Sequence, residues 1–368
     1  MLEFELSGFA ASAVATLALT PAAMAAARRF GVLDRPSGHK QHASPTPLLG
    51  GVAMAAAFAV GLWVASRSGV TFDPLLLIGA LILLIVGWVD DLRPLGVAPK
   101  LTAQLVAVAL PVAGLISQGG ISRGDSVGTA LVGAFFVLLL TNSFNLLDNA
   151  DGVTAAVAGI TALGLAAWAT SAAPATAALA ACLAGTAFAF LLFNRPPARV
   201  FMGDAGSLWI GYVAAGSAFA LAEAQIQAGV PVLKTVTALG CLFLVPLFDT
   251  GLVSLSRLRR GKNPLTTPGR DHLAHRLRLL GFGPGAVTAL IAAGAVLGGV
   301  TGRGVYLGIL PAPAVAVVLA FMGTAGFVYL ERVWMRAGQT ATAPNSTDDP
   351  RRDGDGELPR PATATHGN

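Results

Sequence analysis

Charged residues are scarce in this sequence. They make up 12% of its 368 residues, whereas a typical soluble chain carries about 25%, and hydrophobic residues make up 54%. So low a charge content excludes a soluble enzyme, a disordered protein and a nucleic-acid-binding protein. The net charge of +5 is too thinly spread over so apolar a chain to indicate a nucleic-acid surface. The composition therefore predicts a polytopic membrane protein.

Cysteine is also rare, and a familiar nucleotide motif is missing. Cys182 and Cys241 lie far apart in apolar runs, without the close spacing of a metal site or a redox pair, and we interpret them as small buried side chains. No Gly-x-x-x-x-Gly-Lys-Ser/Thr sequence is present, which argues against ATP hydrolysis of the Walker type.

Long apolar runs, by contrast, are abundant. A helix needs about 20 apolar residues to cross the hydrocarbon core, and eleven stretches qualify: 7–27, 48–66, 74–90, 101–118, 128–144, 153–171, 175–193, 206–222, 235–255, 283–301 and 305–330. In the first stretch the basic residues follow the apolar run, so we expect a retained helix rather than a cleaved signal peptide. The predicted fold is an all-α integral membrane protein with about eleven transmembrane helices.

The loops between these stretches differ in basic content. If they alternate sides, one set together with the C-terminal tail carries 20 Lys and Arg residues, and the other set carries four. The positive-inside rule then places the N-terminus outside and the C-terminus in the cytoplasm, in the inner (plasma) membrane. We expect residues 1–336 to form the membrane domain and residues 337–368, rich in Pro, Gly, Thr and Asp, to form a disordered tail.

Acidic, amide and histidine side chains collect in the loops predicted to be cytoplasmic. The group comprises Asp90, Asp91, Asn142, Asn145, Asp148, Asp151, Asn194, Asp204, Asp271, His272 and His275. Asp249 differs, because it lies within the stretch 235–255 and is predicted to be about 12 Å deep in a straight helix. An acid at such a depth needs a partner or a water-filled cavity, so it is a functional candidate. The pattern predicts an active site at the cytoplasmic interface.

Each cluster has a structural alternative. Asp90 and Asp91 would mark a solvated helix end, and Asp151 and Asp204 would cap the helices that follow them. Residues 270–281 would form a basic amphipathic helix on the lipid surface. For the whole chain, the alternative is a secondary transporter, although transporter sites usually lie near the bilayer midplane.

The inventory of polar groups narrows the chemistry. Oxygen ligands without a cysteine–histidine cluster favour Mg²⁺ over Zn²⁺, with Mn²⁺ as an alternative. Mg²⁺ beside Lys, Arg and His is typical of phosphoryl transfer, since these groups stabilise charge on the transferring phosphoryl. An interfacial position predicts that one substrate is a lipid phosphate and the other a soluble phosphate ester.

Five segments in order along the chain carry a resemblance to a known family. They are DRPSGHKQHASPTPLLGG at 34–51, VDDLRPLGVAPKLTAQ at 89–104, NSFNLLDNADG at 142–152, FNRPPARVFMGDAGSLWIG at 193–211 and GRDHLAHRL at 269–277. With these segments the chain resembles the polyprenyl-phosphate N-acetylhexosamine-1-phosphate transferases of glycosyltransferase family 4. The HLAHRL pattern looks closer to the undecaprenyl-phosphate N-acetylglucosaminyl 1-phosphate transferase branch than to the muramoyl-pentapeptide branch.

The resemblance implies a reaction and a set of roles. GlcNAc 1-phosphate, or another N-acetylhexosamine 1-phosphate, passes from a UDP-sugar to undecaprenyl or decaprenyl phosphate, and UMP is released as a cell-envelope polysaccharide is begun. The implied catalytic residues are Asp90, Asp91, Asp148 and Asp151; Asn145 and Asp204 bind Mg²⁺, and Lys100 meets the lipid phosphate. Contacts to the nucleotide sugar are implied for Asn142, Asn194, Asp249, Arg270, His272, His275 and Arg276. A homodimer is one arrangement that the sequence leaves open.

Two positions depart from the family pattern. Asp148-Asn149-Ala150-Asp151-Gly152 stands where the family usually has Asp-Gly-x-Asp-Gly, so one glycine and its backbone freedom are lost. Ala274 occupies the middle of a motif that is commonly His-x-His-His, which removes one potential phosphate donor. The muramoyl-pentapeptide nucleotide and other UDP-N-acetylhexosamines stay alternative donors.

Overall fold

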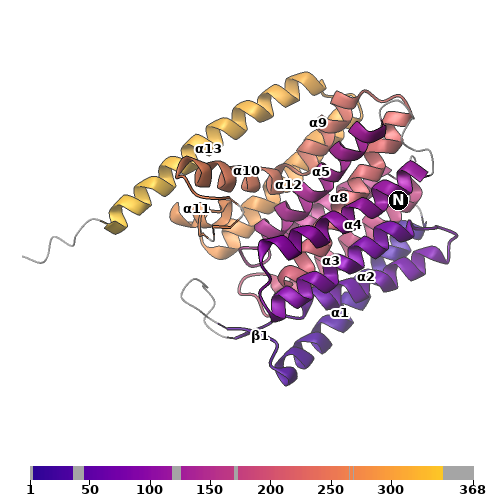
Figure 1. Ribbon diagram of the computed structural model, residues 1–368, viewed down its shortest axis with the longest axis horizontal. Helices are drawn as coiled ribbons and strands as arrows, with labels where there is room; N and C mark the ends of the chain where they lie inside the picture. Colours follow the sequence, from indigo (N-terminus) through magenta and orange to yellow (C-terminus); the bar gives the residue numbers. More distant parts are fainter. Residues whose placement is uncertain are drawn as a thin grey trace, which may run out of the picture.

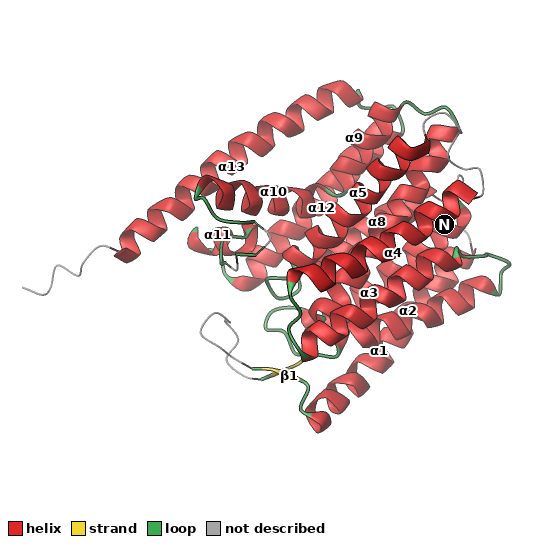
Figure 2. Ribbon diagram, viewed as in Figure 1, coloured by secondary structure: helices red, strands yellow, loops and turns green. Residues whose placement is uncertain are grey.

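The structure, a computed structural model, describes residues 3–35, 45–117, 126–169, 173–264, 266–267 and 269–342. These residues form a bundle of helices with one short pair of antiparallel strands (Figures 1 and 2). In chain order the elements are α1 (Glu3–Phe30), β1 (Leu33–Asp34), β2 (Thr46–Pro47), α2 (Gly50–Ser66), α3 (Pro74–Leu92), α4 (Val97–Ser117), α5 (Ser126–Leu147), α6 (Val153–Ala169), α7 (Pro174–Asn194), α8 (Gly203–Gln227), α9 (Val232–Leu242), α10 (Leu244–Arg259), α11 (Leu273–Leu279), α12 (Pro284–Tyr306) and α13 (Ala312–Thr342).

The predicted apolar stretches correspond to helices. Within the described residues, seven helices are long and apolar enough to cross a membrane, or eight if the bent pair α9–α10 counts as one span. Three shorter apolar helices, at α2, residues 131–147 and α6, account for the remaining stretches. The chain is therefore an all-α, multi-pass membrane protein, as predicted. The count of eleven spans and their orientation stay predictions.

The expectation of one straight helix over 235–255 is wrong. The axes of α9 and α10 differ by 80°. Pro246 gives the physical reason, because it has no N–H for the carbonyl of Leu242 and its ring would clash with that oxygen in a continuous helix. The Leu242 carbonyl instead accepts a hydrogen bond from Thr161 Oγ1 at 3.5 Å. The bend also removes the basis for the depth predicted for Asp249, which assumed a straight helix.

α8 is the most buried of the candidate spans. Of its apolar stretch 89% is buried, compared with 17% for α13. It packs against α2, α3, α5, α6, α7 and α9. Its approach to α2 requires glycine, because a Cβ added at Gly51 would overlap the backbone of Gly206. The Tyr212 hydroxyl also donates to the Ala107 carbonyl of α4 at 2.7 Å. These contacts hold the start of α8 in a fixed position, so functional side chains there are rigidly placed.

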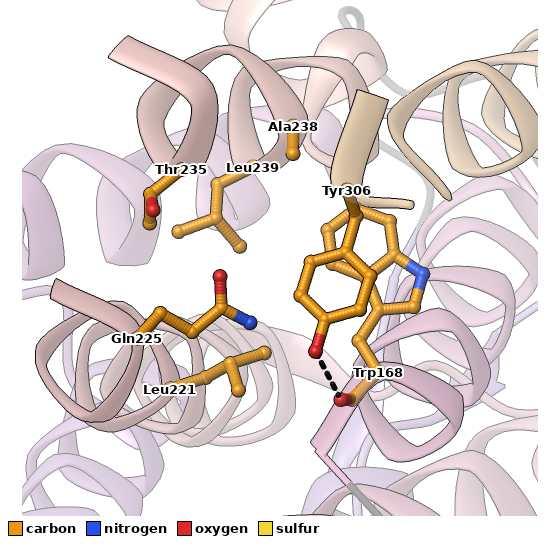
Figure 3. A pocket seen from close by; sticks show the side chains of 7 residues that line it. All are labelled: Trp168, Leu221, Gln225, Thr235, Ala238, Leu239 and Tyr306. Atoms are coloured by element: carbon orange, nitrogen blue, oxygen red, sulfur yellow. Dashed lines mark hydrogen bonds between the residues drawn. The ribbon is translucent and has the colours of Figure 1, made fainter. Parts of the chain in front are cut away.

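The two ends of the bundle differ in chemistry. One end carries the β1–β2 pair and α11, and there α3 and α5 end while α4, α6 and α8 begin (Figure 1). The other end carries a small pocket in which the Tyr306 hydroxyl donates to the Trp168 carbonyl at 3.3 Å (Figure 3). Its lining consists of Trp168, Leu221, Gln225, Thr235, Ala238, Leu239 and Tyr306. None of these side chains is charged, so this pocket does not offer the predicted phosphate chemistry.

The C-terminal helix runs further than the sequence suggested. α13 continues to Thr342, past the predicted domain boundary at residue 336. Residues 343–368, which make up the rest of the predicted tail, lie outside the described residues, as do residues 36–44 of the first motif.

Candidate active site

Three helix ends meet around one lysine. Lys100 lies in the first turn of α4, and its Nζ is 3.0 Å from Asp90 Oδ2 on α3 and 2.8 Å from Asp204 Oδ2 on α8. Asp90 is itself held by the Leu95 N–H, which donates to its other oxygen at 2.6 Å. The packing of α8 between α3 and α5 thus brings a cation and two carboxylates, distant in sequence, into direct contact.

Asp91 has a different set of partners from Asp90. Its Oδ1 accepts from the Asp204 N–H at 2.8 Å and its Oδ2 from the Ala205 N–H at 3.1 Å. The first N–H groups of a helix have no partner within the helix, and a carboxylate there is also favoured by the helix dipole. Asp91 of α3 therefore caps α8, and the alternative that Asp204 caps its own helix is wrong, since that helix has no side-chain cap of its own.

A glycine makes room for this cap. Gly203 adopts a φ of +67°, and a Cβ added there would overlap the Asp91 carboxylate. Only glycine adopts such a φ without strain. In the segment 193–211, Gly203 thus allows the backbone turn and leaves room for Asp91, which places Asp204.

Asn145 reaches the same carboxylate from α5. Its Nδ2 donates to Asp204 Oδ1 at 3.1 Å and to Ser207 Oγ at 3.0 Å. The sequence analysis missed Ser207, which follows Asp204 at a spacing of three and shares its helix face. Asp204 is thus contacted by side chains from α4 and α5 and supported by Asp91 from α3.

Asp148 lies in the turn after α5. Burial raises the pKa of its carboxyl to about 7, and the negative charges of Asp204, Asp91 and Asp151 act in the same direction. A carboxyl with such a pKa exchanges its proton near neutral pH, as general acid–base groups do. Asp148 therefore lies within electrostatic reach of Asp204 and Asp91.

Three of the predicted residues have structural partners. Asn142 Nδ2 donates to Gln104 Oε1 at 2.6 Å, which joins α5 to α4. Asn194 Oδ1 accepts from the Gly152 N–H at 3.0 Å, and Asp151 Oδ2 accepts from the Ala198 N–H at 2.9 Å. These bonds fasten the loop 195–202 to the turn after α5. The roles in catalysis or nucleotide binding that the sequence implied for these residues stay predictions.

A second cluster surrounds the start of α11. Asp249 is fully buried on α10, with its Oδ2 2.9 Å from His272 Nδ1, and its Oδ1 accepts from the Leu273 N–H at 2.6 Å. One carboxylate thus orients the imidazole and caps the helix that follows. A ring nitrogen bonded to a carboxylate in this way leaves Nε2 as the group for a ligand.

The next histidine is held uncharged. Burial, together with the positive charges of His272, Arg278 and Arg270, lowers the pKa of His275 to about 4. Its Nδ1 has no hydrogen-bond partner among the described residues, and its ring lies 6.3 Å from that of His272. Ala274 between them is buried in the main apolar core, so this departure from the family motif contributes packing.

Arg276 does not face the site in the way the sequence implied. It is fully buried, and its Nη1 donates to Glu331 Oε2 of α13 at 2.7 Å. Asp271, also buried, accepts from both Arg257 and Arg260. Although burial raises the pKa of Asp271, these two guanidinium groups lower it to about 2. This part of the segment is structural, whereas Arg270 is exposed.

A sequence match decides which family these features belong to. Residues 74–222 match the profile of glycosyl transferase family 4. A protein of Streptomyces coelicolor named as a glycosyltransferase is 36% identical over 312 residues, which cover 82% of this chain and 68% of that protein. The chain belongs to glycosyl transferase family 4. This confirms the family, polyprenyl-phosphate N-acetylhexosamine-1-phosphate transferases, and the prediction of an enzyme that transfers a sugar phosphate.

Two further relatives of this family 4 enzyme carry more specific names. An undecaprenyl-phosphate N-acetylglucosaminyl 1-phosphate transferase of Bacillus subtilis is 28% identical over 285 residues, which cover 74% of this chain and 77% of the relative. A phospho-N-acetylmuramoyl-pentapeptide-transferase of Heliobacterium modesticaldum is 36% identical over 204 residues, but these cover 48% of this chain and 61% of the relative. The profile match spans the cluster around Asp204 and ends before the histidine cluster.

Proposed function

We propose that this family 4 enzyme transfers GlcNAc 1-phosphate from UDP-GlcNAc to a polyprenyl phosphate at the cytoplasmic face of the plasma membrane. The observation that carries the proposal is the contact of Lys100 with both Asp90 and Asp204, at 3.0 and 2.8 Å. Two phosphate substrates repel each other, so positive charge is needed where they meet. Lys100, a cation held between two acids at the end of a membrane-embedded bundle, supports such a meeting point.

The proposed reaction exchanges one phosphoanhydride for another. A terminal oxygen of the lipid phosphate bonds to the β-phosphorus, which carries the sugar. The bond from this phosphorus to the bridging oxygen breaks, and UMP leaves with that oxygen and its electron pair. The attacking phosphate has a second pKa of ~6 and is mostly dianionic at neutral pH, so it needs little activation by a base. The protein contributes mainly position and charge compensation.

Lys100 is the group that we assign to the lipid phosphate. Its ammonium already pairs with oxygen anions of Asp90 and Asp204, so a phosphate oxygen can replace one of them without a large movement of the lysine. Asp90 holds the lysine in place. Asp91 positions Asp204 through the first turn of α8, since both its oxygens are occupied by backbone N–H groups.

Asp204 and Asn145 are the residues that would hold Mg²⁺. Among the described residues, no three acidic, histidine or cysteine side chains converge on one point. Mg²⁺ needs no such cluster, because it is commonly held by one or two carboxylates with water and substrate phosphates as its other ligands. Lys100 against Asp204 shows that this carboxylate accepts a cation, and the Asn145 amide can present its oxygen there after a half-turn. When bound, Mg²⁺ neutralises charge on the transferring phosphoryl group.

We assign the second cluster to the donor diphosphate. His272 is held by Asp249, His275 has an unpaired ring nitrogen among the described groups, and Arg270 is exposed beside them. These groups can donate to or pair with phosphate oxygens. Asp148, with a pKa raised to about 7, is an acid that can exchange a proton near neutral pH during the reaction.

The extent of the matches supports GlcNAc as the sugar. The Bacillus subtilis relative, named for GlcNAc 1-phosphate transfer, is matched over 77% of its length, and the muramoyl-pentapeptide relative over 61%. The muramoyl-pentapeptide nucleotide is the alternative donor, supported by the higher identity within the shorter match.

A panel of donors tests the proposal. Purified full-length enzyme is incubated with undecaprenyl or decaprenyl phosphate, Mg²⁺ and one of UDP-GlcNAc, UDP-GalNAc or UDP-MurNAc-pentapeptide, and UMP is measured. We expect UMP and a lipid-linked GlcNAc diphosphate with UDP-GlcNAc. Turnover with UDP-MurNAc-pentapeptide alone would replace the sugar assignment, and no UMP with any donor while Asp204→Ala behaves identically would refute the reaction.

A further inference from the structure

A buried ion network joins the last helix to the segment that carries the histidines. Arg276 of α11 is fully buried and Glu331 of α13 is 7% exposed, and their closest oxygen and nitrogen are 2.7 Å apart. The same guanidinium donates through Nε to the Asp271 carbonyl at 2.7 Å. Glu331 lies outside all five motifs that identified the family, so nothing local in the sequence singled it out.

The network closes on itself through α10. Ser256 Oγ donates to the second oxygen of Glu331 at 3.1 Å. Arg260 donates to that same hydroxyl at 3.2 Å and to Asp271 Oδ2 at 2.7 Å, and its guanidinium lies 4.3 Å from the ring centre of Trp334 on α13. Glu331 is therefore the point where α10, α11 and α13 are joined. Buried charges are tolerated only when paired in this way.

The consequence for the site lies in the two peptide groups that flank His272. The carbonyl before it, of Asp271, is held by Arg276, and the N–H after it, of Leu273, is held by Asp249. The His272 ring is held by Asp249 as well, at 2.9 Å. His272 thus has little freedom, and the restraint on its N-terminal side depends on Arg276. The only carboxylate paired with Arg276 in the described chain is Glu331.

We propose that Glu331 is a positioning residue for the donor nucleotide sugar. It acts through Arg276 on the backbone at His272 and does not touch the substrate. The proposal rests on the function proposed above, in which His272, His275 and Arg270 meet the donor diphosphate. It predicts a defect confined to the donor, because the lipid phosphate is met by Lys100 in the other cluster.

Steady-state kinetics on the purified full-length enzyme test this role. For Glu331→Gln we expect the KM for the UDP-sugar to rise about tenfold and the KM for polyprenyl phosphate to stay within twofold. Glu331→Asp, which keeps the charge, restores part of the donor affinity. The matched control is Arg332→Gln, which removes an exposed charge one residue away on the same helix and leaves both KM values unchanged.

A double variant separates positioning from stability. Glu331→Gln leaves the buried Arg276 charge without its carboxylate, so it also lowers the thermal unfolding midpoint. Glu331→Gln with Arg276→Met removes both charges, and replacing a buried pair by apolar groups restores stability in many proteins. We expect the midpoint of the double variant to recover while the donor KM stays raised, since the Asp271 carbonyl is still not held.

Four outcomes would overturn the proposal. An unchanged donor KM in Glu331→Gln does so, and so does an equal rise in both KM values. Recovery of the donor KM together with the unfolding midpoint in the double variant shows a merely structural role. Hydrogen exchange gives a reading that needs no turnover: Glu331→Gln accelerates exchange in residues 272–279 but not in 203–211. Unchanged exchange refutes the anchoring, whereas absence of UMP from the wild type refutes the reaction alone.

Discussion

The contact between Gly203 and Asp91 makes the most specific prediction about the site. Gly203 has no chemical group of its own, but a methyl group there would overlap the carboxylate that caps α8. In Gly203→Ala, Asp91 must move and lose its bonds to the N–H groups of Asp204 and Ala205. We therefore expect this variant to lose activity as fully as Asp91→Asn, although both Asp204 and Lys100 are still present.

The size of the activity loss expected for Gly203→Ala follows from two free-energy contributions. Hydrogen bonds to a charged group contribute about 1.5 to 3 kcal/mol each, so two of them give about 3 to 6 kcal/mol for the placement of α8's first turn. The left-handed backbone adds about 1 to 2 kcal/mol for any residue with a Cβ. A change of about 1.4 kcal/mol corresponds to a factor of ten in rate. If the variant loses even half of the hydrogen-bond contribution, we therefore expect kcat to fall at least tenfold.

Gly229→Ala is the matched control for this experiment. Gly229 also has a positive φ, +83°, but no atom lies within 4 Å of a Cβ added there. It therefore carries the backbone strain without the collision. UMP release by the two variants is compared at saturating substrates, with detergent-solubilised folded protein verified by its unfolding midpoint. Equal kcat values for Gly203→Ala and wild type would refute the cap as a requirement, and equal losses in both glycine variants would show that strain alone is responsible.

Three other predictions test separate parts of the site. Asp249→Asn weakens the hold on the His272 ring, so the KM for the UDP-sugar rises about tenfold while the lipid KM stays constant; a change confined to the lipid KM contradicts the assignment of the second cluster. Removal of divalent metal with EDTA stops UMP release and Mg²⁺ restores it, whereas activity that survives chelation contradicts a metal at Asp204 and Asn145. The pKa of Asp148 is raised in the folded protein, to about 7, so the stability linked to this group is present at low pH and lost as the pH rises through about 7. In EDTA the unfolding midpoint of Asp148→Asn, relative to wild type, therefore increases between pH 5 and pH 8, and a pH-independent difference argues against the raised pKa.

The sequence was sufficient for the helices and for the family. Each long apolar run appears as helix, because a segment in lipid must satisfy its backbone groups internally. The structure brings Asp90, Lys100, Asn145 and Asp204, which stand in three of the sequence motifs, into contact, and the roles implied for them stay predictions. The break between α9 and α10 had a visible signal in Pro246, which the apolar composition of the run concealed.

Other features had no local signal. Asp91 looked like a partner of Asp90 in one acid pair, but the two carboxylates point to different helices and only the packing of α3 on α8 separates their tasks. Arg276 looked like a ligand for phosphate because it follows the histidines, and its burial depends on an acid on α13. Contacts between distant segments of this kind are set by helix packing, and a short motif does not encode them.

The burial of α8 has a genetic consequence. Asp204 stands on the first turn of a helix whose sides are packed throughout the bundle, so bulky replacements well away from the substrates can reach the chemistry by shifting the helix along its axis. In a genetic screen for heat-sensitive mutants, we expect such bulky replacements to occur at the glycine, alanine and serine positions of residues 206–219. The exposed surface of α13 would tolerate apolar exchanges and yield few, whereas the buried Glu331 on the same helix would not tolerate exchange.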